Sequence, residues 1–143
     1  FETQCYWALE NKLPVVIHTR NSLKETINII SKPHFKDLNG IFHCFDSSYE
    51  DAMKLIDLGF LIGIGGILTF KNSNLRETIA KIGIEKLVLE TDSPYLSPEP
   101  YRGKRNEPAN ILYIAEMLQK ITSIPLAKIS QITTKNANEL FDL

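Results

Sequence analysis

Three side chains of metal-binding type stand at the ends of short apolar runs in this chain of 143 residues. His18 and His43 each follow such a run directly, and Asp92 comes shortly after another, at residues 87–89. Imidazole nitrogens and carboxylate oxygens are common ligands of zinc, manganese and related divalent ions. If the runs are parallel strands, their carboxyl ends meet at one edge of the sheet. The pattern therefore predicts a shared metal site, although either histidine alone could be a hydrogen-bonded core residue.

Two further charged residues are expected beside the candidate ligands, because side chains two positions apart on a strand point the same way. Glu90 precedes Asp92 by two positions, and Arg20 follows His18 by two. Glu90 could hold a histidine ligand in place as a second carboxylate, or it could pair with a lysine. Arg20 could bind a phosphate or carboxylate with its guanidinium, or it could form a salt bridge at the rim of the fold.

The loop after Asp92 is basic and aromatic. Basic groups bind phosphates, and aromatic faces can stack on nucleic-acid bases. A short charge cluster is more often solvated surface, but the position directly after a candidate ligand favours substrate binding. The residues concerned are Tyr95, Tyr101, Arg102, Lys104 and Arg105.

Cys44 directly follows His43, which raises the question of a Cys-His nucleophile. Neighbours on a strand point to opposite faces, so we exclude that pair. The third apolar run contains Gly63, Gly65 and Gly66. Glycines within a strand indicate either a close backbone approach or room left for a ligand.

Four apolar runs, each followed by a helical pattern, predict an α/β fold built on a parallel sheet. Their ends lie about 25 residues apart, enough for one strand and one crossover helix. The first run shows no polar alternation, which is typical of a strand buried on both faces. The strands are expected at residues 15–17, 40–42, 60–66 and 87–91.

Polar residues and proline mark the expected helix starts. Ser22 opens a capping-box pattern and Ser48 can cap the next helix. Asn106 could simply cap the helix whose first turn contains Pro108. The chain is expected to end in two short helices, at residues 126–132 and at residues 133–141 after a Thr133 cap.

Composition limits the classes of function. The net charge of −1 gives no global basic field for nucleic acid, so any such affinity must come from a local patch. Two cysteines do not form a disulfide framework, and no apolar run is long enough to span a membrane. We expect residues 1–143 to form a single domain, with reduced thiols, no membrane partner and a cytoplasmic location.

Several stretches resemble one family, the TatD-type metal-dependent deoxyribonucleases. They are VVIHTR (15–20), GIFHCF (40–45), GFLIGIGGILTFKN (59–72), LVLETDSPYLSPEPYRGKRNEPANI (87–111) and ITTKNANELF (132–141). The resemblance covers essentially the whole chain in order. It implies a TIM-type (β/α) barrel, here a partial barrel of about four βα units plus C-terminal helices. It also implies hydrolysis of phosphodiester bonds in DNA with one or two divalent ions, such as Zn, Mg or Mn.

The resemblance also assigns roles by position. His18, His43 and Asp92 match metal-binding residues, and Asp92 also matches the group that handles the attacking water. Arg20 and the basic loop would then position the phosphate backbone.

This sequence departs from the family pattern at its beginning. The family starts with a strand carrying a His-x-His pair and continues to a metal-bridging glutamate, and neither is present here. We therefore expect the C-terminal part of a barrel, with low or absent nuclease activity in isolation and self-association through two open sheet edges. The alternatives are an enzyme of the same fold acting on a small amide or ester, and a fragment without catalysis.

Overall fold

A computed structural model describes residues 1–143 and contains one parallel sheet. Its strands are β1 (Val15–His18), β2 (Gly40–His43), β3 (Phe60–Ile64) and β4 (Leu87–Leu89), paired in the order β1-β2-β3-β4. The predicted parallel α/β architecture is confirmed. The last two strands are shorter than expected: β3 ends at Ile64 and not at Gly66, and β4 ends at Leu89 and not at Thr91.

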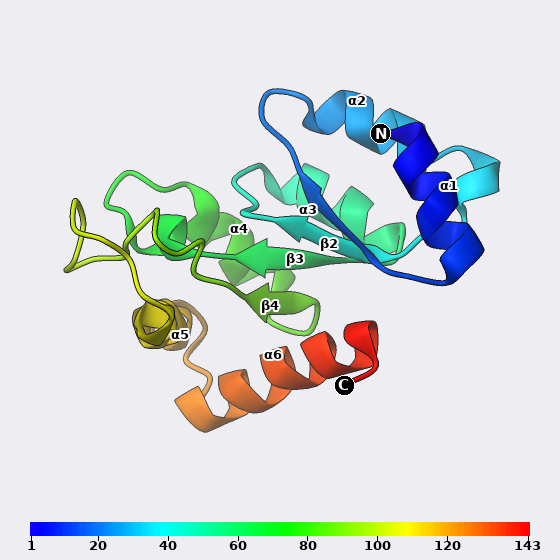
Figure 1. Ribbon diagram of the computed structural model, residues 1–143. Helices are drawn as coiled ribbons and strands as arrows, with labels where there is room; N and C mark the ends of the chain where they lie inside the picture. The colour runs from blue at the N-terminus through cyan, green and yellow to red at the C-terminus, as the bar shows by residue number, and fades with distance from the viewer.

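Helices connect the strands and follow the last one. They are α1 (Glu2–Asn11), α2 (Leu23–Ile30), α3 (Tyr49–Asp57), α4 (Leu75–Ile82), α5 (Ile111–Thr122) and α6 (Leu126–Phe141), with short 3-10 turns η1 (Pro33–Phe35), η2 (Gly66–Thr69) and η3 (Pro108–Asn110). Figure 1 shows α1 and α2 beside β1, at one side of the sheet, and α6 running along β4 at the other. None of the helices combines the length and apolar character needed to cross a membrane.

The helix ends confirm one predicted cap and correct two other expectations. The Ser48 hydroxyl accepts a hydrogen bond from the Asp51 amide at 3.2 Å and caps α3. Ser22 makes no such bond, so the predicted capping box is absent from α2. Thr133 does not start a new helix, because α6 runs unbroken from Leu126 to Phe141. The buried Thr133 hydroxyl donates instead to the Ile129 carbonyl within that helix, at 3.0 Å.

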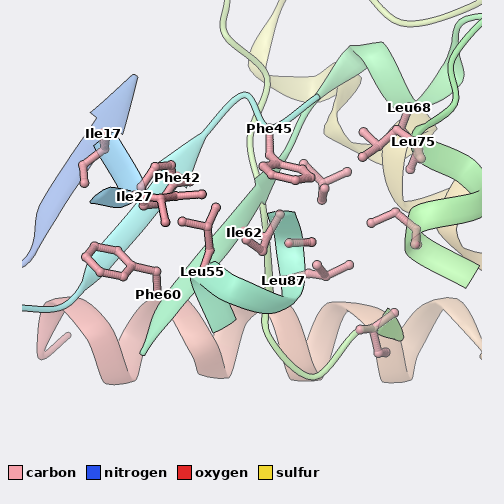
Figure 2. Close-up of a cluster of buried hydrophobic side chains, with 14 of the residues drawn as sticks. Ile17, Ile27, Phe42, Phe45, Leu55, Phe60, Ile62, Leu68, Leu75 and Leu87 are labelled. Carbon is pink, nitrogen blue, oxygen red and sulfur yellow. The ribbon is translucent and has the colours of Figure 1, made fainter. Parts of the chain in front are cut away.

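The core lies between one face of the sheet and the helices. Ile17, Phe42, Ile62 and Leu87 are partners across the four strands and form one buried row. Figure 2 shows these side chains with others of the cluster of 23 buried residues. All six helices contribute to this cluster, so they cover the same face. Alternate strand residues, including the two histidines, point to the opposite face.

The two edges of the sheet differ from each other. Val16 on β1 is 60% exposed, so the expectation that this strand is buried on both faces is wrong. Along β4, the Asn136 side chain of α6 donates to the carbonyls of Glu85 and Leu87 at 3.0 and 2.8 Å. The Leu87 carbonyl, on the outer edge of β4, is therefore bound by α6. No further strand pairs with β1 or with β4, and α6 runs along the β4 side.

Candidate metal centre

The two strand-end histidines lie side by side. β1 and β2 pair in register, and His18 is the direct partner of His43. Their ring centroids are 5.6 Å apart. Because the preceding residues, Ile17 and Phe42, point into the core, both histidines project from the opposite face of the sheet. The sequence prediction that His18 and His43 meet at one edge is confirmed.

Glu90 reaches across the sheet to His43. One carboxylate oxygen lies 2.9 Å from His43 Nδ1, and the other accepts the amide hydrogen of Cys44. β3 separates β2 from β4, and Gly63 occupies the crossing point. A Cβ on Gly63 would lie 2.7 Å from the Glu90 carboxylate. The glycine therefore makes room for a side chain of the protein itself, and of the two open alternatives for Glu90, contact with a histidine is confirmed.

Asp92 approaches the same imidazole from its other nitrogen. Its Oδ1 lies 3.6 Å from His43 Nε2, too far for a hydrogen bond. The strand alternation that predicted a shared side for Glu90 and Asp92 does not apply, because β4 has already ended and Asp92 adopts a positive φ of 56°. The two carboxylates nevertheless converge, one on each ring nitrogen of His43.

Cys44 belongs to the same cluster, contrary to the expectation that its side chain points away from His43. The residue follows the end of β2 and has a φ of 52°, so strand alternation no longer holds. Its sulfur, a ring nitrogen of His43 and a carboxylate oxygen of Asp92 all lie within 4.8 Å of one another. Burial, and then the nearby Glu90 and Asp92 carboxylates, raise the pKa of the Cys44 thiol to about 12. Without a bound ion the thiol stays protonated at neutral pH, which supports excluding a nucleophilic thiolate.

The donor set fits a divalent ion. Ligands of a tetrahedral zinc ion, ~2.0–2.3 Å from the metal, lie about 3.3–3.8 Å apart, and the distance from His43 Nε2 to Asp92 Oδ1 is within that range. With its Nδ1 held by Glu90, His43 presents Nε2 to the space beside Asp92. His18 lies outside the tightest group of potential ligand atoms. Its ring needs a side-chain rotation to join them.

The loop after Asp92 is organised by Asn106, whose role the sequence suggested only as a helix cap. The side chain is buried and its Nδ2 donates to the carbonyls of Thr91 and Tyr95, both at 2.6 Å. Its Oδ1 accepts from the Glu107 amide and from Asn110 Nδ2, both at 2.9 Å. Asn106 thus joins the two ends of the loop, next to the candidate ligand Asp92.

The basic and aromatic residues of this loop are more dispersed than the ligand cluster. The Arg102 guanidinium stacks 3.6 Å from the centroid of the Phe70 ring, and the Lys104 ammonium lies 5.8 Å from that of Tyr101. Arg105 and Arg20 are exposed, and Tyr95 is 71% exposed. Arg102 lines a polar cleft of about 980 Å³ beside the ends of β2 and β3.

The chain is similar to known proteins over nearly its whole length. A family model described as TatD related DNase matches residues 1–142. An uncharacterized metal-dependent hydrolase from Buchnera aphidicola (subspecies Acyrthosiphon pisum) is 46% identical, over 95% of this chain and 52% of the relative. YabD of Bacillus subtilis, with the same description, is 37% identical over 99% of this chain and 56% of its own length.

A solved structure shares the fold. The crystal structure of YJJV, a TatD homolog from Escherichia coli K12, matches with a TM-score of 0.92 and 27% identity. The match covers 99% of this chain and 55% of that one, so the four βα units correspond to about half of that protein. The chain likewise spans about half the length of the curated relatives it matches. The predicted partial (β/α) barrel is confirmed, and the chain belongs to the TatD related DNase family.

Proposed function

We propose that this chain carries the metal and phosphate sites of a hydrolase that cleaves phosphodiester bonds in DNA. The observation that supports this most is the position of His43, between Glu90 at 2.9 Å and Asp92 at 3.6 Å, with His18 beside it. The names of the relatives add support, since they describe metal-dependent hydrolases.

His18, His43 and Asp92 would hold the divalent ion, which can be Zn, Mg or Mn. Such an ion polarises the phosphoryl oxygen and makes a bound water more acidic. Glu90 accepts the Nδ1 hydrogen of His43 and so keeps the Nε2 lone pair free for the metal. Asp92 has a second role in this proposal, because its carboxylate can take the proton of the attacking water.

The substrate would be held by the basic residues around the strand ends. The guanidinium of Arg102 and the charges of Lys104 and Arg105 would bind phosphates along the loop, and Arg20 would do so from the β1 side. The exposed ring of Tyr95 offers a face for a base to stack on. These features favour a phosphodiester over a small amide or ester, which would need no such spread of positive charge.

The test is hydrolysis of a fluorophore-labelled deoxyoligonucleotide by the chain in excess, with Zn²⁺, Mg²⁺ or Mn²⁺ added separately. Excess protein and long incubation are used because we expect at most low activity from three ligand residues. We expect Asp92→Asn to lower the rate by about 10²–10⁴-fold, while His34→Ala, far from the cluster, leaves it unchanged. Equal rates for Asp92→Asn and the unmodified chain would contradict the proposal. So would hydrolysis of a carboxylic ester with no cleavage of DNA.

Self-association through the open β1 edge is part of the same proposal. Val16, Leu13 and Trp7 are each about 60% exposed at this side of the molecule, and an unpaired strand edge invites pairing with another chain. Light scattering should show association that rises with concentration and that Val16→Lys reduces. A monodisperse monomer at all concentrations would rule out self-association.

Both cysteines are free, which is consistent with the proposed cytoplasmic location.

A further inference from the structure

Cys44 has a position that neither the sequence pattern nor the family assignment explains. Its sulfur, a ring nitrogen of His43 and a carboxylate oxygen of Asp92 lie within 4.8 Å of one another. We propose that Cys44 is a third ligand beside His43 and Asp92, so that the site takes a thiophilic divalent ion such as zinc or cadmium. This inference rests on the metal site of the proposed function, but it does not depend on DNA cleavage.

The backbone holds the sulfur on the side of the site. β2 ends at His43, and the positive φ of Cys44 breaks the alternation that would otherwise turn its side chain away. Glu90 then connects the two neighbours, with one oxygen near His43 Nδ1 and the other accepting the Cys44 amide hydrogen. A single carboxylate thus sets the position of the imidazole relative to the thiol.

The distances are close to those of a bound ion. Tetrahedral ligands of zinc lie about 3.3–3.8 Å apart, so a shift of ~1 Å brings all three atoms into range, which side-chain rotation can supply. On binding, the thiol proton leaves to solvent as the sulfur–metal bond forms. Thiolate selects zinc and cadmium over magnesium and manganese. Cys44 would therefore determine which ion the site prefers, while His18 remains available as a further nitrogen ligand.

Cadmium provides a direct test, because a cadmium–thiolate bond has an ultraviolet charge-transfer band. The chain is titrated with Cd²⁺ while binding is measured in parallel by calorimetry, with Mn²⁺ as the comparison ion. We expect one band per bound ion. Cys44→Ser should remove the band and weaken Cd²⁺ binding by about tenfold or more, with Mn²⁺ affinity changed by less than about threefold. Cys5→Ser is the matched control, since Cys5 is a free cysteine buried in the core, and it should keep the band.

X-ray absorption on the unmodified chain with Cd²⁺ bound gives the same answer without any substitution, since it detects a sulfur ligand directly. Cd²⁺ binding without a sulfur ligand, or a band that persists in Cys44→Ser, would overturn the role of Cys44 and leave the proposed metal site standing. No Cd²⁺ binding would overturn the role of Cys44, and no binding of either Cd²⁺ or Mn²⁺ would overturn the metal site as well. A normal cadmium band in a chain that fails to cleave DNA would support the inference and count against the proposed function alone.

Discussion

The two sides of the proposed metal centre are built differently. On the β4 side, Glu90 crosses Gly63 to hold His43, and Asn106 joins the ends of the loop that carries Asp92. On the β1 side, His18 stands at the end of an open edge strand and is exposed. The two histidines are direct partners across the strands, yet only His43 is held by a second residue.

This difference separates preorganised ligands from adaptable ones. A ligand whose position is set by hydrogen bonds loses little freedom when a metal binds, so more of its interaction appears as affinity. An exposed side chain at an edge must first be ordered. The β4 side should therefore dominate metal binding, while the β1 side contributes less and tolerates change.

The largest expected effect separates the two histidines. His43→Ala should weaken divalent-ion affinity by about 100-fold or more, because it removes the nitrogen that Glu90 orients, whereas His18→Ala should weaken it by roughly tenfold. Isothermal titration with Zn²⁺ or Mn²⁺ measures both, with His34→Ala as the control. Equal losses for His18→Ala and His43→Ala would remove the distinction between the two sides.

Asn106→Ala tests whether the loop on the β4 side is held by one side chain. The change removes four hydrogen bonds of a buried amide and leaves backbone groups without partners, so we expect a loss of ~2–3 kcal/mol in the free energy of unfolding. Denaturant titration measures this. The exposed Asn28, on α2 at the β1 side, provides the control Asn28→Ala, and a similar loss in both variants would contradict the account.

Gly63→Ala tests how Glu90 reaches His43. The new methyl group would lie 2.7 Å from the Glu90 carboxylate, so we expect a destabilisation of about 1–2 kcal/mol and roughly tenfold weaker metal binding. Gly65→Ala is matched, because its nearest new contact is an ordinary 3.7 Å. Calorimetry measures the metal affinity of the Gly63→Ala and Gly65→Ala variants. Unchanged metal affinity in Gly63→Ala would mean that Glu90 reaches His43 without needing the space beside Gly63.

The smallest effect concerns the β1 side and depends on pH. Lys32 lies 2.8 Å from Glu2 and, chiefly through this hydrogen bond, lowers the pKa of the Glu2 carboxyl below its ordinary value of 4.5. The stabilisation is therefore present above pH 4.5 and is lost as the pH falls through the lowered pKa. Between pH 7 and pH 3, the melting temperature of the Glu2→Gln variant should fall slightly less than that of the unmodified chain. Glu10→Gln is the control, and identical acid sensitivity of all three would show that the pair contributes nothing.

Much of the site could be predicted from the sequence because regular elements carry it. Apolar runs of strand length placed His18 and His43 at equivalent ends, and the parallel register then brought them together. The part of the site that could not be predicted depends on residues outside regular structure. Cys44 and Asp92 adopt positive φ angles beyond the strand ends, where alternation no longer predicts direction. The role of Gly63 depends on Glu90, which is distant in the sequence and meets it only in the folded sheet.

The central claim is that the carboxyl ends of β1, β2 and β4 form one metal site around His43. Anomalous diffraction from crystals of the chain grown with Mn²⁺ or Zn²⁺ tests it most directly. We expect a single strong peak between His43 Nε2 and the Asp92 carboxylate, about 2.0–2.3 Å from each, with His18 turned toward it. A bound ion elsewhere on the molecule, with no peak beside His43 Nε2, would contradict it.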